Sequence, residues 1–347
     1  MASKKILPMK YPWITSLPVF ANTNAILVNY EDYYPWFIHS HIQLVAWETP
    51  EIYIQFYTPV FREYYRLFKM HHYEKRVLSK WCDNIEQFII DAINEGHYVY
   101  LSIDQYYISS YESFGKRHGA HDMLIYGYDQ QRQVFYIADF FRTIYSFEEA
   151  NFESVNKAFL SPYSEGEWFK GVQLLKLKDH KREFKLDLEY LIKQLKEYLY
   201  EIKSSVDYKL IEEPGKDSDS WGIGVYSFLI NHVRGSKEFV FSLVRSVHLL
   251  YDHKEVILRG LEYLNNLNYI TDYELHSEAY RDIKKQCLIL RNLCLKYMFS
   301  ESKQDIQHVI RLISQIEMKE RIAIQKIILD LENIKLDQGT RVCRLDE

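Results

Sequence analysis

Three runs between residues 97 and 140 decide the fold of the N-terminal half: His97-Tyr-Val-Tyr-Leu-Ser-Ile-Asp104, His121-Asp-Met-Leu-Ile-Tyr-Gly-Tyr-Asp129 and Gln133-Val-Phe-Tyr-Ile-Ala-Asp-Phe140. Each run is short, apolar and bounded by polar residues, a pattern typical of buried β-strands. Only a short polar turn separates the second run from the third, so we expect these two strands to be antiparallel. His121 begins one strand and Asp139 ends the next, and their side chains are therefore predicted to be neighbours.

A histidine oriented by a carboxylate is half of a nucleophilic triad. The competing interpretation is a strand-end histidine that only hydrogen-bonds an acid, and the order of the strands favours the triad. Asp122 and Asp129 are interpreted as turn or surface groups. His118 is interpreted as a solvated side chain, with contact to substrate at the mouth of the cleft as the alternative.

Composition restricts the class of protein. The chain has 347 residues, of which 47% are hydrophobic, enough for two domains with sizeable cores. Its net charge of −5 and the lack of a basic block argue against nucleic-acid binding. The N-terminus has no apolar signal core and no run reaches membrane-spanning length, so we expect a cytoplasmic protein without a membrane partner.

The four cysteines, at positions 82, 287, 294 and 343, show no CxxC spacing. A structural zinc site and a disulfide framework are therefore not expected. Cys287 and Cys294 lie seven positions apart in an apolar helical stripe and are expected in a core.

The pattern of elements predicts an α+β domain with an antiparallel sheet over residues 1–180, followed by an all-helical domain over residues 181–347. In the first domain we expect a short helix from about Asn22, capped by Asn22 or Thr23, and a helix over 85–93 behind the capping box Asp83-Asn-Ile-Glu86. Residues 34–45 are ambiguous between helix and strand. Further predicted elements are a helix over 152–160, a strand over 172–177, and helices over 186–202, 221–234, 236–268, 272–299 and 302–332.

The block from His121 through Gly127-Tyr128-Asp129 to Asp139 resembles the His/Asp half of papain-like bacteriocin-leader peptidases. It is more similar to their relatives, the N-terminal domains of butirosin-type side-chain acyltransferases and the amide synthases of closthioamide-type thiotemplated pathways. The Tyr106-Tyr107 loop and the Trp36 to Leu44 segment share this resemblance, which covers roughly residues 12–160.

The resemblance implies a cysteine nucleophile at the start of the first helix, in the pattern Cys-x-x-x-Ala-(Leu/Ile). The matching stretch is Ala21-Asn-Thr-Asn-Ala25-Ile26, so the cysteine position holds Ala21. Either the chain is a natural pseudoenzyme, or alanine has been substituted for cysteine. Retention of both His121 and Asp139 favours substitution.

Other nucleophiles and a metal site remain as alternatives. Cys82 precedes a predicted helix start that could activate its thiol, but it follows the expected chain order poorly. Thr23 and Ser16 lie near the cysteine position and are harder to activate. His39 and His41 would face the same side of a strand and could share a metal ion, although no third ligand is evident.

The resemblance thus implies a thioester-dependent acyltransferase or amide synthase in the biosynthesis of a nonribosomal antibiotic. Its acyl donor would be the phosphopantetheine arm of an acyl or peptidyl carrier protein, and its acceptor an amine. A thiolate at position 21 would attack the thioester, His121 would act as base, and Asp139 would fix the imidazole tautomer. Backbone amides after position 21 would form the oxyanion hole. The rivals are a papain-like cysteine peptidase and a catalytically silent binding module.

Overall fold

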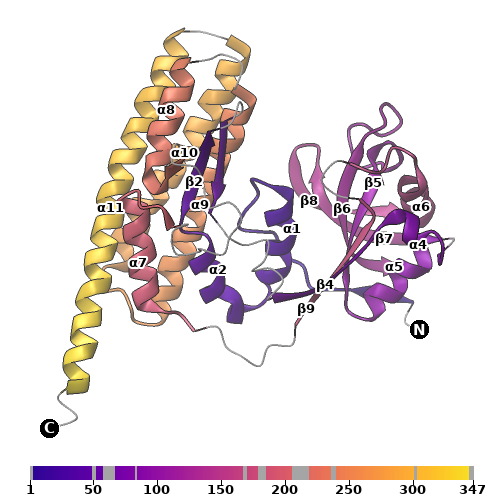
Figure 1. Ribbon diagram of the computed structural model, residues 1–347, viewed down its shortest axis with the longest axis horizontal. Coiled ribbons are helices and arrows are strands. Elements are labelled where there is room, and N and C mark those ends of the chain that lie inside the picture. The colour runs from indigo at the N-terminus through magenta and orange to yellow at the C-terminus, as the bar shows by residue number, and fades with distance from the viewer. Residues whose placement is uncertain are drawn as a thin grey trace. The chain divides into compact units, whose positions relative to one another are not determined.

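The computed structural model describes residues 3–48, 52–57, 67–82, 84–166, 170–178, 185–204, 219–235, 240–300 and 303–343. It confirms the α+β class, with an antiparallel sheet in the N-terminal region and long helices in the C-terminal region (Figure 1). The chain groups into two compact units. Unit 1 comprises Met1–Pro12, Leu17–Asn29 and Phe61–Arg182, and unit 2 comprises Trp13–Ser16, Tyr30–Val60 and Glu183–Glu347. One boundary lies close to the predicted division after residue 180, whereas residues 30–60 group with the C-terminal helices.

Unit 1 is built on an antiparallel sheet of seven strands. Along the sheet the order is β4 (Phe68–Tyr73), β9 (Val172–Leu177), β5 (Tyr98–Asp104), β6 (Ala120–Asp129), β7 (Val134–Phe141) and β8 (Ile144–Asn151). A seventh strand, β1 (Lys4–Ile6), pairs with the end of β6. The three strands predicted between residues 97 and 140, and the strand over 172–177, are thereby confirmed.

Gly127 allows β1 to join this sheet. A Cβ atom at this position would lie 2.7 Å from the carbonyl oxygen of Lys5, closer than a Cβ is found to any neighbour. The absence of a side chain therefore lets the N-terminal strand pair with β6.

The described part of unit 1 contains the α-helices α1 (Pro18–Leu27), α4 (Lys75–Leu78), α5 (Ile85–Asn94) and α6 (Phe152–Leu160). The Asn84 side chain caps α5 by accepting a 2.8 Å hydrogen bond from the Glu86 amide, while the predicted cap residue Asp83 lies outside the described residues. Helices α5 and α6 pack side by side against the sheet (Figure 1). The predicted helices over 85–93 and 152–160 are confirmed.

Unit 2 resolves the ambiguous segment into a helix, α2 (Tyr34–Ser40), followed by a strand, β2 (Leu44–Glu48). This strand lies between β10 (Ser220–Trp221) and β3 (Ile52–Phe56) in a small sheet that the sequence did not predict. The predicted helices correspond to α7 (Leu188–Leu199), α8 (Val225–Gly235), α9 (Val240–Asn266), α10 (Tyr273–Ser300) and α11 (Lys303–Cys343).

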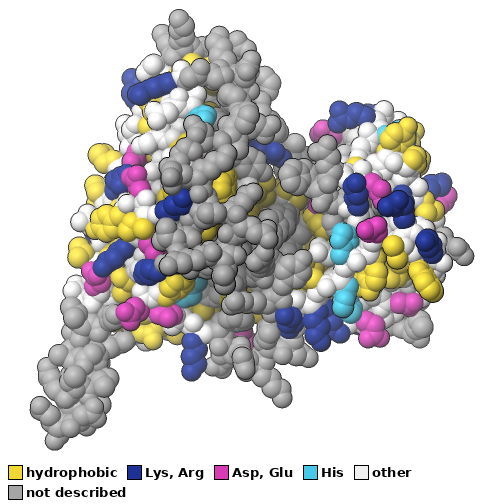
Figure 2. All heavy atoms as spheres, in the orientation of Figure 1, with side chains coloured by type: hydrophobic (Ala, Val, Ile, Leu, Met, Phe, Trp, Pro, Cys, Tyr) yellow, Lys and Arg dark blue, Asp and Glu magenta, His cyan; other side chains and the backbone are white. Residues whose placement is uncertain are grey.

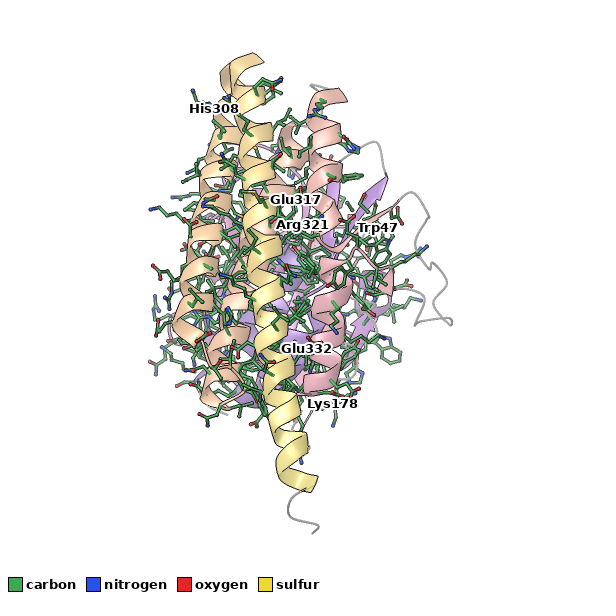
Figure 3. All side chains as sticks on the ribbon, turned by 90° about the vertical axis from the view of Figure 1, so that its left-hand side faces the viewer. Trp47, Lys178, His308, Glu317, Arg321 and Glu332 are labelled. Atoms are coloured by element: carbon green, nitrogen blue, oxygen red, sulfur yellow. The ribbon has the colours of Figure 1, made fainter. Side chains whose placement is uncertain are left out.

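Polar contacts join α11 to the α7 region. Figure 3 shows Glu317, Arg321 and Glu332 along α11. The Arg321 guanidinium lies 2.6 Å from the Glu201 carboxylate and 2.9 Å from that of Glu317. A second ion pair, 2.6 Å long, joins Lys196 of α7 to Glu332. These partly exposed pairs fix how the helices align and contribute little stability individually.

A fully buried polar cluster lies in the core of unit 2. Lys254 of α9 and Glu320 of α11 form an ion pair of 2.6 Å. The Tyr226 hydroxyl donates to Glu320 at 2.6 Å, and the Lys254 ammonium lies 2.8 Å from Nδ1 of His253. His253 in turn reaches the carbonyl of Ile42 with its Nε2 at 2.8 Å. Each charged group thus has hydrogen-bond partners, as burial requires.

On the face shown in Figure 2, acidic, basic and hydrophobic side chains of the described residues are interspersed. No described helix carries an apolar stretch that would span a bilayer.

Candidate active site

His121 and Asp139 lie side by side in unit 1, as the sequence predicts. Nε2 of His121 is 2.9 Å from Oδ2 of Asp139. The β6–β7 hairpin causes this contact, because antiparallel pairing places the start of β6 beside the end of β7. Asp139 is fully buried, whereas the His121 side chain is 26% exposed. A buried carboxylate therefore holds a histidine that solvent can still reach.

Two further groups hold the Asp139 carboxylate. The Tyr111 hydroxyl donates to Oδ2, and the Phe140 amide donates to Oδ1 at 2.7 Å. Burial, and then the charge of Asp139, raises the pKa of Tyr111 well above its usual value, so the phenol remains a donor. The sequence did not identify Tyr111, because it lies in an irregular loop without periodicity.

The pair determines the protonation of His121. Burial lowers the pKa of the imidazole, but the hydrogen bond and charge of Asp139 outweigh it, and the pKa is raised above the usual 6.5. Because Asp139 accepts from Nε2, the neutral ring carries its lone pair on Nδ1, which has no hydrogen-bond partner among the described residues. This nitrogen is available as a base.

Asp122 does not belong to the pair, but it is not the turn or surface group that the sequence suggested. It lies on β6, where its carboxylate accepts a hydrogen bond from the Tyr100 hydroxyl. Burial, and then the charge of Asp139, raises the pKa of Asp122 to about 6. Asp129 does lie at a turn, where it accepts the Arg132 amide at 3.1 Å.

Ala21 lies in the first turns of α1 and is fully buried. The helix begins at Pro18, four residues before the predicted start at Asn22, because proline is well suited to the first helical position. Asn22 and Thr23 are therefore helix-interior residues, and neither caps the helix. Helix α1 continues beyond position 21, and the Ala21 amide donates to the Leu17 carbonyl at 2.9 Å. The oxyanion hole expected from the amides that follow position 21 stays a prediction.

Helix α1 nevertheless lies beside the strands that carry the pair. The Tyr145 hydroxyl of β8 donates to Oδ1 of Asn22 at 2.9 Å. Tyr145 is the register partner of Phe140, the residue that follows Asp139. This contact brings the residue after position 21 to the neighbourhood of the Asp139 strand.

The other sequence candidates have separate surroundings. Cys82 is partly exposed, and its thiol donates to the Asn84 carbonyl at 2.8 Å. Cys287 and Cys294 are buried, as predicted, and burial raises the pKa of each thiol to about 12. The hydroxyl of Thr23 is bonded to the Phe20 carbonyl inside α1.

The metal interpretation of His39 and His41 is not supported by their geometry. His39 lies in the last turn of α2, and its Nδ1 is 2.9 Å from Oε1 of Gln194. Nδ1 of His41 bonds the Phe37 carbonyl at 2.9 Å. Within the described ranges, no group of three or more His, Cys, Asp or Glu side chains could hold a metal ion.

A protein-family model matches the part of the chain that carries the pair. Residues 39–140 match the family model described as butirosin biosynthesis protein H, N-terminal. The matched segment contains His121 and Asp139 and ends one residue after the latter, but it begins after Ala21. It supports the resemblance to butirosin-type acyltransferases. No curated protein sequence matches the chain.

Proposed function

We propose that the chain is a thioester-dependent acyltransferase or amide synthase of antibiotic biosynthesis, with a papain-like reaction scheme. The observation that carries this proposal is the His121–Asp139 pair, which lies within the segment matching the butirosin biosynthesis protein H family model. The acyl donor would be a thioester on the phosphopantetheine arm of a carrier protein, and the acceptor an amine.

In the first step, a thiol at position 21 gives its proton to Nδ1 of His121, and the thiolate attacks the thioester carbonyl. The bond from the acyl carbon to the pantetheine sulfur breaks, and the leaving thiolate takes the proton back from the imidazolium. Asp139 keeps Nε2 protonated throughout, so that Nδ1 is the nitrogen that exchanges the proton.

In the second step, the amine attacks the acyl group held at position 21. His121 removes the proton from the amine nitrogen, the bond from carbon to the protein sulfur breaks, and the sulfur recovers a proton. The product is an amide. Exclusion of water from this site would make amide formation faster than hydrolysis.

Position 21 is alanine in this chain, and the scheme requires a cysteine there. The placement of α1 beside β8, through Asn22 and Tyr145, supports a nucleophile at this helix. The complete burial of Ala21 is the observation that favours the second candidate function, a catalytically silent binding module of an assembly line.

The test restores the thiol. Ala21→Cys is made together with Cys82→Ser, because Cys82 is the partly exposed thiol that could be acylated without catalysis. The double variant is mixed with a short-chain acyl thioester of N-acetylcysteamine, and intact mass is measured. We expect addition of one acyl group, and its transfer to an added primary amine.

Two comparison variants make the result decisive. The acyl adduct should be lost when His121→Gln is added and when Ala21→Ser replaces Ala21→Cys, a change of matched size. An absent adduct in a folded protein would favour the silent module. An adduct that yields free acid but no amide would favour the peptidase.

A further inference from the structure

A second carboxylate–imidazole pair lies in unit 1, formed by His118 and Asp104. Nδ1 of His118 is 2.7 Å from Oδ2 of Asp104. Asp104 is fully buried at the end of β5, and the His118 side chain is 39% exposed. The sequence suggested a solvated histidine, whereas the structure shows an imidazole held in one orientation.

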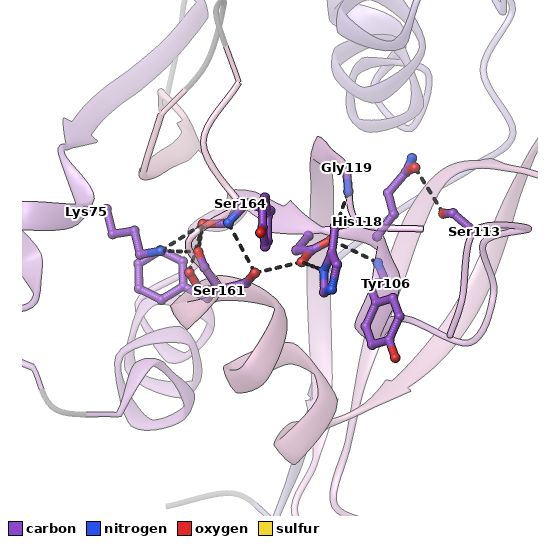
Figure 4. A network of polar contacts seen from close by, with 11 residues as sticks. Lys75, Tyr106, Ser113, His118, Gly119, Ser161 and Ser164 are labelled. Atoms are coloured by element: carbon purple, nitrogen blue, oxygen red, sulfur yellow. Dashed lines mark hydrogen bonds and ion pairs between the residues drawn. The ribbon is translucent and has the colours of Figure 1, made fainter. Parts of the chain in front are cut away.

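The Asp104 carboxylate is fully engaged, as Figure 4 shows. Besides His118, it accepts hydrogen bonds from the Ser161 hydroxyl at 2.6 Å and from the amides of Gly119 and Tyr106 at 3.0 and 3.1 Å. Burial raises the pKa of Asp104, but these hydrogen bonds outweigh it and lower the pKa below its usual value. The carboxylate therefore stays ionised beneath the ring.

Two tyrosines fix the plane of the His118 ring. Tyr106 stacks on one side, with ring centroids 4.2 Å apart, and Tyr163 stacks at 4.6 Å. Tyr107 lies at 6.1 Å. With Nδ1 bound to Asp104, the neutral ring carries its lone pair on Nε2, which has no hydrogen-bond partner in the described part of the chain. Such an arrangement presents a fixed proton acceptor.

The strand register places the two pairs at neighbouring positions of one ladder. Asp104 is opposite Ala120, and the neighbouring rung of the β5–β6 ladder joins Ile103 to His121. The two carboxylate–imidazole pairs therefore start from adjacent rungs of one ladder. Side chains at neighbouring positions of a strand point to opposite faces, so a substrate that contacts both imidazoles has to reach across the end of this ladder.

We propose that His118 binds the amine acceptor of the transfer reaction and removes its first proton. This inference rests on the proposed function. The acceptor arrives as an ammonium ion, and Nε2 of His118 takes one proton from its nitrogen, which leaves a neutral amine and an imidazolium stabilised by Asp104. The amine then attacks the acyl group, and His121 takes the second proton.

The charges around His118 favour an ammonium ion over an anion. The nearest fixed charge is the Asp104 carboxylate, and tyrosine rings border the imidazole on both sides. Lys75 is the cation in the hydrogen-bond network of Figure 4. Its ammonium donates to the Ser161 carbonyl and the Ser164 hydroxyl, each at 2.8 Å. The other charged or titratable groups on adjoining segments are Glu112, Lys116, Arg117, Asp122, Glu153, Lys157 and Glu165.

The first test measures binding without any transfer. Imidazole nitrogen resonances are recorded by NMR while n-butylammonium is added, with n-butanol and inorganic phosphate as comparison probes. We expect the Nε2 resonance of His118 to shift with the ammonium alone, and the shift to disappear in Asp104→Asn. His72, whose Nε2 lies 2.7 Å from the Lys170 carbonyl, is the internal control and should not respond. A response to phosphate, or none from His118, overturns the inference.

The second test measures proton removal. Acyl protein is prepared from the variant carrying Ala21→Cys and Cys82→Ser, and single-turnover release by two amines is compared at pH 7. With n-butylamine, which is protonated at this pH, His118→Gln should slow amide formation by about 10-fold or more. With 2,2,2-trifluoroethylamine, which is already neutral, the loss should be less than about twofold.

Equal losses with both amines would assign His118 a structural role and contradict the proposal. His72→Gln provides the matched control and should leave both rates unchanged. If no acyl protein forms, the proposed function fails, while the NMR titration still decides whether His118 is an ammonium site.

Discussion

Nε2 of His121 lies 2.9 Å from a carboxylate oxygen of Asp139, and the acid is completely buried while the imidazole keeps about a quarter of its surface exposed. The hairpin that joins β6 to β7 creates this contact, and Tyr111 and the Phe140 amide hold the acid in place. One ring nitrogen is thereby fixed as a donor and the other is left as a base.

Removal of the Asp139 charge should lower the pKa of His121. In Asp139→Asn the hydrogen bond and charge that raise the pKa are lost, while burial, which lowers it, remains. We expect the pKa to move from above 6.5 to below it, measured by NMR titration of the imidazole.

The same pKa shift makes stability depend on pH. The folded-state pKa of His121 is raised, so protonation of this ring favours the folded state. The stabilisation is complete below about pH 6.5 and is lost as the pH rises through the folded-state value. The difference in urea midpoint between the parent and Asp139→Asn should therefore shrink from pH 5 to pH 8, and a constant difference would contradict this.

Loss of the Tyr111 hydroxyl should raise the pKa of His121 further. In Tyr111→Phe the Asp139 carboxylate loses a donor and interacts more strongly with the imidazole. The variant should also be destabilised by about 1 kcal/mol, the net value of one hydrogen bond. Tyr107→Phe, which removes the hydroxyl of a half-buried ring outside this contact, is the control. An unchanged His121 titration in Tyr111→Phe would refute the prediction.

Removal of one partner of the buried Lys254–Glu320 ion pair should lower the free energy of unfolding strongly, and replacement of both partners should lower it little. Lys254→Met alone, or Glu320→Leu alone, leaves an unpaired charge in the core and should cost about 3–5 kcal/mol. The double variant should lie much closer to the parent, because no charge is left buried. Urea unfolding of all four proteins completes the cycle, and simple additivity would contradict the expected coupling.

Ionisation of the buried Asp252 carboxyl should make the folded protein less stable as the pH rises. Burial raises the pKa of this carboxyl to about 7. The hydrogen bond that it accepts from the Thr15 amide at 2.7 Å lowers the pKa, but by less than burial raises it. The folded state then binds more protons than the unfolded state between about pH 4 and 7, and stability falls across that window by at most about 1.4 kcal/mol per pH unit. Relative to the parent, Asp252→Asn should therefore be more stable at pH 8 than at pH 5. A stability difference between Asp252→Asn and the parent that does not change with pH would refute the assignment.

The sequence predicted the elements whose signal is local. Apolar runs bounded by turns gave β5, β6 and β7, and helical periodicity gave α5, α6 and the long helices of unit 2. The His121–Asp139 contact was predictable for the same reason, since one short hairpin determines it.

The remaining features depend on contacts between distant segments. Strand β8 is polar at Ser146, Glu148 and Glu149 because it lies at the edge of the sheet, so it lacks a clear strand pattern. Residues 30–60 join the C-terminal helices through packing that no local pattern reveals. Tyr111, and the stacking of Tyr163 on His118, likewise follow from tertiary folding.

The most direct test of the central claim is the acidity of a thiol placed at position 21. In the protein carrying Ala21→Cys and Cys82→Ser, the rate of alkylation by iodoacetamide is measured from pH 5 to pH 9, with and without His121→Gln. The account predicts fast alkylation well below the ordinary thiol pKa of about 8.5, and a return to ordinary behaviour when His121 is replaced. Identical pH profiles in the two proteins would show that position 21 and His121 do not act together.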